Sequence, residues 1–204
     1  MAIEIHVDHR AAIIIFISGG SILSSDNILI SNGVTGEFAF VTPSVWDDLK
    51  EDIFEIEEES FSSSLCDSKD DLLKLINSPT SIFIVLRIPS VSRVIGYLAA
   101  DMLEGFSEVP GITSDPYIDQ GKTIYIVSVA IHRDWRRLGL GVATQKECLR
   151  VASQRGFKRV TAHIESGAAS RMGLGARVLM SFANWYGTGR TFDYVEFSTH
   201  LRET

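Results

Sequence analysis

A short turn near the middle of the chain contains four residues whose types and spacing suit an anion: Arg136, Arg137, Gly139 and Gly141. An arginine guanidinium can donate two parallel hydrogen bonds to phosphate oxygens. A glycine has no Cβ, so its backbone can adopt unusual dihedral angles and a phosphate can approach closely. The chemistry that these residues predict is the binding of a pyrophosphate.

The elements on either side of this turn would place it at the start of a helix. Residues Thr123–Ile131 form an apolar run rich in β-branched side chains, which is typical of a buried strand. A helical pattern begins at the turn and ends near Arg155. The first N–H groups of a helix have no partner within it, and the helix dipole favours negative charge there. The order of strand, glycine-rich turn and helix therefore strengthens the prediction.

The spacing distinguishes this turn from other phosphate-binding motifs. Arg136-x-x-Gly139-x-Gly141 is too short for the dinucleotide fingerprint G-x-G-x-x-G, and it lacks the Gly-Lys-Ser/Thr ending of a P-loop. It is similar to the Arg/Gln-x-x-Gly-x-Gly/Ala motif of the GCN5-related N-acetyltransferase (GNAT) superfamily, whose loop holds the pyrophosphate of acetyl-CoA. The run from Ala130 to Gly141 resembles the longer family pattern around that motif, and a strand-like segment at 159–164 follows the helix, as in the family.

The resemblance implies an α/β GNAT fold, in which a mixed, mostly antiparallel central sheet has splayed fourth and fifth strands and is flanked by helices. It implies acetyl-CoA as the co-substrate, held by backbone groups of the fourth strand, here Thr123–Ile131. In the family a β-bulge N–H of that strand often polarises the reacting carbonyl, and by position the backbones of Val129 and Ile131 would do so here. The implied cofactor-binding residues are Val129, Ala130, Ile131, Arg136, Arg137, Leu138, Gly139, Leu140, Gly141, Val142 and Ala143.

An acidic helical segment resembles the start of the acceptor loop in two groups of the superfamily. Residues Phe54–Phe61 resemble the E-x-x-x-F element of ribosomal-protein alanine N-acetyltransferases and of arylalkylamine N-acetyltransferases. The loop after this element covers the acceptor amine in those enzymes, which implies substrate-binding roles for Glu58 and Phe61. The polar segment from Leu103 to Lys122 is long for a loop, which favours a functional cover or a mobile flap.

Acetyl transfer to an amine requires a neutral amine, a polarised carbonyl and a proton for the departing thiolate. Typical family members carry a tyrosine on the helix after the fifth strand, and that tyrosine can supply the proton. In this chain the segment is shortened, and Leu174 or Gly173 occupies the tyrosine position. The usual general acid is therefore in doubt.

Four other residues are candidates for the catalytic side chains. Tyr125 is in phase with the later alternate residues of its strand, so it would point into the acceptor cleft. Tyr186 would act as an acid from the closing turn, and Glu165 or His163 would act as a base at the end of the fifth strand. Each also has a structural alternative: a core aromatic for Tyr125, a satisfied strand residue for His163 and a surface carboxylate for Glu165.

The composition narrows the class of protein and its partners. A chain of 204 residues with 45% hydrophobic and 22% charged residues fits one soluble domain with decorations. The formal charge of −7 argues against broad nucleic-acid binding. No basic leader precedes a long apolar run, which predicts no membrane association and a cytoplasmic location. Two cysteines make no disulfide framework, and His6, Asp8 and His9 lack further ligands, so we expect no metal site.

The chain divides into two predicted parts. Residues 1–35 form an N-terminal β extension with strand-like runs at Ile3–Val7, Ile13–Ile17 and Asn27–Ile30, separated by turn residues. Residues 36–204 form the acetyltransferase domain. The expected partners are acetyl-CoA and an amine acceptor, and a second copy of the chain, as a homodimer, is a further candidate.

Three functions remain open at this point. The leading prediction is acetyl transfer to a protein or peptide N-terminal amine, because Asn184-Trp185-Tyr186 resembles the N-Y-Y turn of peptide N-terminal acetyltransferases. The second is transfer to a small arylalkylamine or polyamine, since arylalkylamine acetyltransferases have a comparable insertion at Leu103–Lys122. The third is a sensor module that binds acetyl-CoA without turnover, which the missing helix tyrosine keeps open.

Overall fold

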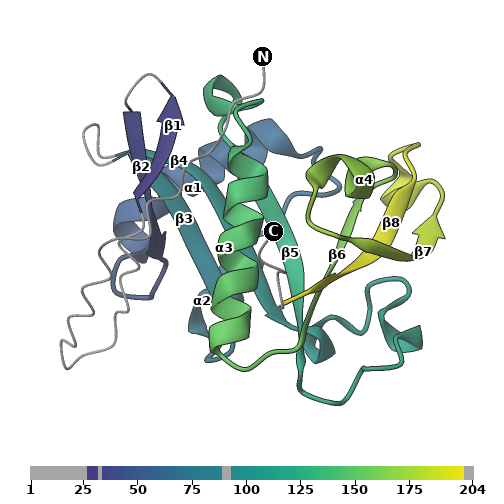
Figure 1. The fold of residues 1–204 in the computed structure, drawn as a ribbon. Helices are drawn as coiled ribbons and strands as arrows, with labels where there is room; N and C mark the ends of the chain where they lie inside the picture. The colour runs from purple at the N-terminus through teal and green to yellow at the C-terminus, as the bar shows by residue number, and fades with distance from the viewer. Residues whose placement is uncertain (1–26, 32–33, 89–92, 200–204) are drawn as a thin grey trace.

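Within the described part of the chain, eight strands form one sheet in the order β1-β2-β3-β4-β5-β6-β8-β7 (Figure 1). The computed structural model describes residues 27–31, 34–88 and 93–199, so the predicted runs at Ile3–Val7 and Ile13–Ile17 lie outside it. Neighbouring strands are antiparallel except β5 and β6, which are parallel. This is the mixed, mostly antiparallel sheet that the resemblance implied.

The elements follow one another with few long connections. The strands are β1 (Asn27–Ser31), β2 (Val34–Phe40), β3 (Ile82–Ile88), β4 (Arg93–Met102), β5 (Thr123–Ile131), β6 (Arg159–Glu165), β7 (Arg177–Phe182) and β8 (Phe192–Ser198). The α-helices are α1 (Trp46–Ser60), α2 (Lys69–Asn77), α3 (Leu140–Gln154) and α4 (Ala168–Met172).

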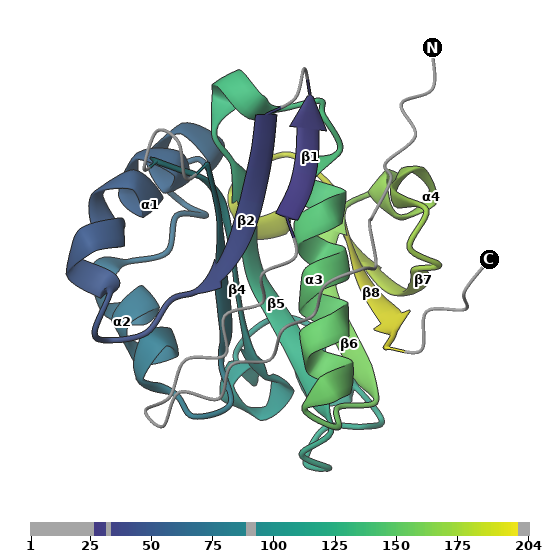
Figure 2. The same cartoon turned by 60° about the vertical axis from the view of Figure 1, so that its left-hand side comes forward.

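Helices cover both faces of the sheet, as Figure 2 shows: α1 and α2 lie on one face and α3 on the other. One buried cluster joins α3 to β3–β6 through residues such as Leu149 and Ile126, and another joins α1 and α2 to the opposite face through Ile53 and Phe83. The central strands β3 and β4 are buried on both faces, which explains their nearly continuous apolar sequences. Within the described residues, no helix is long and apolar enough to span a bilayer.

The N-terminal strand β1 extends the sheet instead of forming a separate unit. It pairs antiparallel with β2, which in turn pairs with β3. Strand β2 begins at Val34 and therefore spans the boundary that the sequence placed after residue 35. The expected N-terminal strand is present, and the division of the chain into two parts stays a prediction.

The parallel pairing of β5 with β6 stops partway along both strands. It runs from Thr123 opposite Arg159 to Ile126 opposite Ala162. Strand β5 nevertheless continues to Ile131 and β6 to Glu165. The two strands therefore splay apart beyond this point, as the resemblance implied.

A β-bulge lies in β5 where the splay begins. Ala100 of β4 pairs with Ile126 and Ala99 pairs with Ser128, so Val127 is an extra residue without its own partner. The bulge reverses the alternation of side chains: Ile126 and Val129 both pack toward α3. The prediction that Tyr125 is in phase with Val129 is therefore wrong, because the extra residue lies between them.

The segment between β4 and β5 packs against the sheet. Its side chains Leu103 and Ile112 are fully buried, together with Tyr125 and Tyr194. Asp115 is buried as well and accepts two hydrogen bonds from the Arg159 guanidinium, at 2.9 and 2.7 Å. The insertion thus packs against the sheet through these residues, and its role as a functional cover or a mobile flap stays a prediction.

Candidate active site

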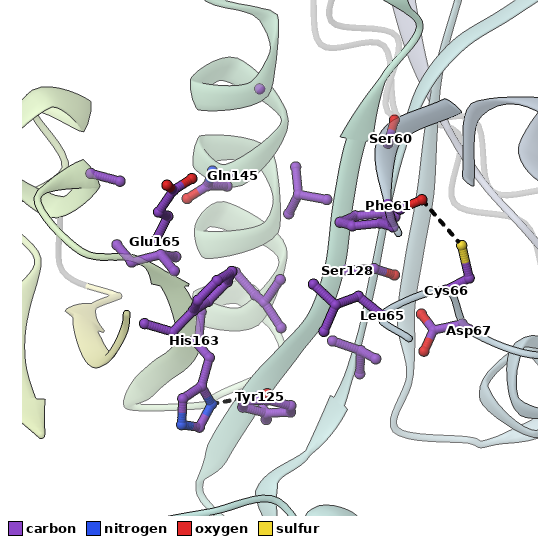
Figure 3. A pocket seen from close by; sticks show the side chains of 18 of the residues that line it. Ser60, Phe61, Leu65, Cys66, Asp67, Tyr125, Ser128, Gln145, His163 and Glu165 are labelled. Atoms are coloured by element: carbon purple, nitrogen blue, oxygen red, sulfur yellow. Dashed lines mark hydrogen bonds between the residues drawn. The ribbon is translucent and has the colours of Figure 1, made fainter. Parts of the chain in front are cut away.

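A cavity of about 1030 Å³ opens where β5 and β6 separate (Figure 3). Its walls come from β5 and β6, the turn before α3, the loop between α1 and α2, the start of the insertion and the turn between β7 and β8. Elements far apart in sequence thus meet around one opening, and every catalytic candidate predicted from the sequence lines it: Tyr125, His163, Glu165 and Tyr186.

The turn before α3 has the backbone geometry of an anion site. Arg137 and Gly139 have positive φ angles of 66° and 77°. Such left-handed residues within a turn direct successive N–H groups toward one point, which forms an anion-binding concavity. Gly139 is also the N-cap of α3, where no side chain caps the helix and no acidic residue lies in the first turn. The first N–H groups of α3 therefore remain available, and the turn fits a pyrophosphate.

The two arginines of the turn differ in their contacts. Arg136 donates through Nε to the Ile131 carbonyl at 2.8 Å and through Nη2 to Ser60 Oγ at 3.0 Å. It therefore ties the turn to the C-terminal end of α1, a role that the sequence did not predict. Arg137 lines the cavity and makes no hydrogen bond or salt bridge elsewhere in the described residues. Arg137 is thus the arginine whose guanidinium is available to a phosphate.

Most of the predicted cofactor residues line the cavity. These are Val129, Ile131, Arg136, Arg137, Gly139, Leu140, Gly141 and Val142. The other three predicted cofactor residues, Ala130, Leu138 and Ala143, do not line the cavity. Ala130 is buried against the α1 and α2 face, and Leu138 and Ala143 pack with Phe38 and Ile95 beneath the turn.

Tyr125 and His163 form a direct pair at the point where the strands part. The Tyr125 hydroxyl lies 3.1 Å from Nδ1 of His163 and shares a hydrogen bond with it (Figure 3). The imidazole is stacked between two aromatic rings, with centroid distances of 4.3 Å to Trp185 and 4.8 Å to Tyr194. These rings fix the orientation of the imidazole toward Tyr125.

Burial sets the protonation of this pair. It lowers the pKa of His163 to about 4, and the backbone carbonyl of Pro110 offsets only part of this effect. Burial also raises the pKa of Tyr125 far above its ordinary range, and the nearby Tyr186 and Tyr194 act in the same direction. At neutral pH the imidazole is therefore neutral and the phenol keeps its proton.

The other two catalytic candidates lie at the edge of the cavity. Tyr186 is 52% exposed, and partial burial and Glu108 raise its pKa. Glu165 is exposed and forms a salt bridge of 3.4 Å with Arg190. The short helix α4 carries no tyrosine, and Leu174 after it is packed into the core. Tyr125 is therefore the best-ordered proton donor of the candidates.

The two residues at the end of α1 that were predicted to bind the acceptor lie in different environments. Phe61 lines the cavity, whereas Glu58 is exposed and does not line it. Glu57 points inward and its Oε1 accepts a hydrogen bond of 2.7 Å from the Asp67 N–H. The helical period was a usable signal, since Glu57 follows the buried Ile53 by four positions.

Asp67 and Ser128 are cavity residues that the sequence analysis missed. Asp67 precedes Ser68, the N-cap of α2, whose Oγ accepts a hydrogen bond from the Asp71 N–H. Ser128 follows the bulge residue Val127 on β5. No sequence signal marks either position, because a loop conformation and a bulge decide where these side chains point.

Several solved structures share the architecture of this chain. The ribosomal-protein-S18-alanine N-acetyltransferase of Escherichia coli superposes with a TM-score of 0.60 at 11% identity, covering 82% of this chain and 96% of that chain. Arabidopsis thaliana NAA60 in complex with acetyl-CoA gives a TM-score of 0.60 at 16% identity, covering 80% and 99%. Ard1 from Thermoplasma volcanium gives 0.58 at 14% identity, covering 80% and 97%. At such identities the likeness establishes the fold.

The family follows from the sequence itself. Residues 46–180, more than half of the chain, match the model of the Acetyltransferase (GNAT) family. The chain belongs to this family. No curated protein sequence matches it closely enough to serve as a relative.

Proposed function

We propose that this protein transfers the acetyl group of acetyl-CoA to a primary amine, with Tyr125 and His163 at the reacting centre. The hydrogen bond of 3.1 Å between these two side chains, at the point where β5 and β6 part, is the observation that carries the proposal. Family membership supports acetyl transfer, and the cavity around this pair supports a two-substrate site.

The turn before α3 would hold the pyrophosphate of acetyl-CoA. The N–H groups that follow Gly139 and the Arg137 guanidinium are the donors that remain for it. Acetyl-CoA supplies the activated acyl thioester. Because Val127 is the extra residue of the bulge, its backbone N–H, rather than those of Val129 and Ile131, is the suitable donor to the reacting carbonyl oxygen.

The proton balance of the reaction assigns roles to the pair. The amine nitrogen bonds to the acyl carbon and loses one proton, the C–S bond breaks, and the sulfur takes up one proton. The Tyr125 hydroxyl retains its proton at neutral pH, so it would donate that proton to the sulfur, and the proton released by the amine nitrogen would restore the hydroxyl by way of solvent in the cavity. His163, with a pKa of about 4, is too weak a base to deprotonate an alkylammonium ion, so it orients the hydroxyl.

The leading acceptor is a protein or peptide N-terminal amine. Phe61 and the turn residues Trp185 and Tyr186 all line the cavity, which supports an extended acceptor held between α1 and that turn. A small amine is the second candidate. The packed insertion favours it, since Phe106 and Val109 narrow the cavity from the other side.

The proposal is tested by acetyl-CoA turnover, followed as release of free thiol, with N-terminal peptides, polyamines and arylalkylamines as acceptors. Calorimetry of acetyl-CoA binding runs in parallel. Binding with thiol release for one acceptor class is the expected result and selects that class. Binding without release for every acceptor would favour a sensor module, and absence of binding would overturn the cofactor site.

A further inference from the structure

The cavity is divided by charge. Arg136 and Arg137 lie at the turn before α3, where the pyrophosphate would bind. The opposite wall, formed by the α1–α2 loop, the start of α2, the end of β4 and the insertion, carries four carboxylates: Asp67, Asp71, Asp101 and Glu108. An acceptor entering from this side meets negative charge.

Three of these carboxylates already have a salt bridge or hydrogen bonds, or are exposed to solvent. Asp71 forms a salt bridge of 2.7 Å with Lys74. Asp101 accepts hydrogen bonds from the Thr80 hydroxyl and the Met102 N–H. Glu108 is exposed. Asp67 is partly buried, as Asp101 is, but it lacks donors such as the Thr80 hydroxyl and the Met102 N–H, and no salt bridge joins it to a lysine or arginine of the described chain.

A second carboxyl without a cation lies directly behind Asp67. Glu57 is only 3% exposed, and its Oε2 has no hydrogen-bond partner in residues 34–88 and 93–199. Burial raises the pKa of Glu57 to about 8 and also raises the pKa of Asp67. Two adjacent buried carboxyls cost stability when they ionise. No lysine or arginine of the described chain offsets the free-energy cost of ionising these two carboxyls. A cationic group of a bound ligand could offset it instead.

Ser128 provides an independent indication that a ligand binds here. The bulge at Val127 places Ser128 on the same side as Asp67, and Figure 3 shows its hydroxyl directed toward that carboxylate. Ser128 is only 7% exposed and lines the cavity. Its Oγ partly stabilises ionised Asp67 but has no well-formed hydrogen bond within the described residues. A buried hydroxyl of this kind ordinarily has a partner.

We propose that Asp67 and Ser128 bind an ammonium group that the acceptor carries in addition to the amine that is acetylated. This inference rests on the proposed acetyl transfer and narrows its substrate class to dicationic acceptors. An ammonium has three donors, which suit the two Asp67 oxygens and Ser128 Oγ. Tyr125, Asp67 and Ser128 line the same cavity, so one molecule that occupies it can contact both subsites.

Alkyl diamines and peptides with a basic side chain both present this chemistry, and matched pairs of acceptors distinguish them. The first pair is hexylamine and 1,6-diaminohexane. The second is alanyl-norleucine amide and alanyl-lysine amide, which differ by the terminal ammonium. We expect wild-type kcat/KM to be about 10- to 100-fold higher for the dicationic member of at least one pair, since hydrogen-bonded charges contribute this much. The pair that responds identifies the source.

The Asp67→Asn variant should remove this preference, because kcat/KM for the dicationic acceptor should fall to about that of its monocationic partner in the same variant. Asp71→Asn is the matched control, because it removes one negative charge from the same wall at a carboxylate already paired with Lys74. It should keep the preference. An equal loss for both members of each pair in Asp67→Asn, or no preference in the wild type, would overturn the inference.

Calorimetry keeps the inference testable if no acceptor is turned over. 1,6-Diaminohexane is titrated into the wild type and into Asp67→Asn, each saturated with coenzyme A. Weaker binding to the variant supports the ammonium subsite even when the proposed acetyl transfer fails. Equal or absent binding in both proteins overturns the subsite alone.

Discussion

The two sides of the cavity, proposed to bind the cofactor and the acceptor and here called the cofactor side and the acceptor side, are built in different ways. The turn before α3 presents backbone N–H groups arranged by the positive φ angles of Arg137 and Gly139. The acceptor side presents side chains, chiefly Tyr125, Asp67 and Ser128, whose directions depend on a bulge and on helix phase. One side is thus specified by local conformation and the other by packing between distant segments.

This difference predicts different responses to substitution. A backbone site tolerates changes in most side chains, provided that the glycine remains. A side-chain site changes with single substitutions, because burial sets the protonation and orientation of each group. We therefore expect substitutions on the acceptor side to change the chemistry and those on the cofactor side to change binding.

The largest expected effect is that of Tyr125→Phe. Removing the hydroxyl removes the proposed proton donor, so kcat should fall about 1,000-fold while the KM for acetyl-CoA stays within about twofold. Steady-state thiol release measures both quantities. Tyr186→Phe is the control, because Tyr186 also lines the cavity but is 52% exposed. A greater loss of kcat in Tyr186→Phe would transfer the donor role to that residue.

The next largest effect is expected for Glu57→Gln, as a change in the free energy of unfolding. The Glu57 carboxyl has a pKa of about 8 in the folded protein and an ordinary value of 4.5. Folding therefore has a cost that is absent below about pH 4.5 and grows as the pH rises toward 8. The variant should be more stable than wild type by on the order of 3 kcal/mol at pH 8, and by less than about 1 kcal/mol at pH 5.

Denaturant unfolding at the two pH values measures this difference. Glu58→Gln is the matched control, because Glu58 is exposed on the same turn of α1. It should change stability little at either pH. A gain for Glu57→Gln that is the same at pH 5 and pH 8 would show that burial of the carboxylate is not its origin.

The cofactor side is tested by Gly139→Val. Gly139 has a φ of 77°, which a β-branched residue rarely adopts, and the added atoms would lie beside the phosphate position. Acetyl-CoA affinity should fall about 100-fold by calorimetry. Gly156→Val is the control, since Gly156 has a φ of 85° at the other end of α3 and does not line the cavity. Equal affinity in the two variants would contradict a pyrophosphate site at the turn.

Local patterns in the sequence predicted most elements and the turn before α3, and the family resemblance supplied the fold in which they are arranged. Apolar runs and breaks indicated most strands and helices, and the glycine spacing indicated a phosphate-binding turn. The splay between β5 and β6 came from the family resemblance and is present in the structure. The elements and the turn need no knowledge of long-range contacts, whereas the splay does.

The acceptor side could not be predicted in the same way. Strand alternation assumes regular pairing, and the extra residue Val127 breaks it, so Ser128 joins the wall with Tyr125. Helical period places Glu57 on the buried face of α1 and Glu58 on its exposed face. The proposed role of Asp67 in binding an ammonium group depends on its burial beside Glu57, and only the folded chain brings these two residues together.

The buried contact between the insertion and the sheet sets a limit on redesign of the acceptor wall. Residues 105–109 supply the wall, whereas Asp115 anchors the segment to Arg159 and Tyr194. Truncating the anchor would leave the Arg159 side chain, only 10% exposed, without one of its two carboxylate partners, and breaking such a pair costs about 3–5 kcal/mol. Substitutions in the first half of the insertion can therefore change acceptor preference. Residues in its second half must be retained, because they anchor the segment to β6 and β8.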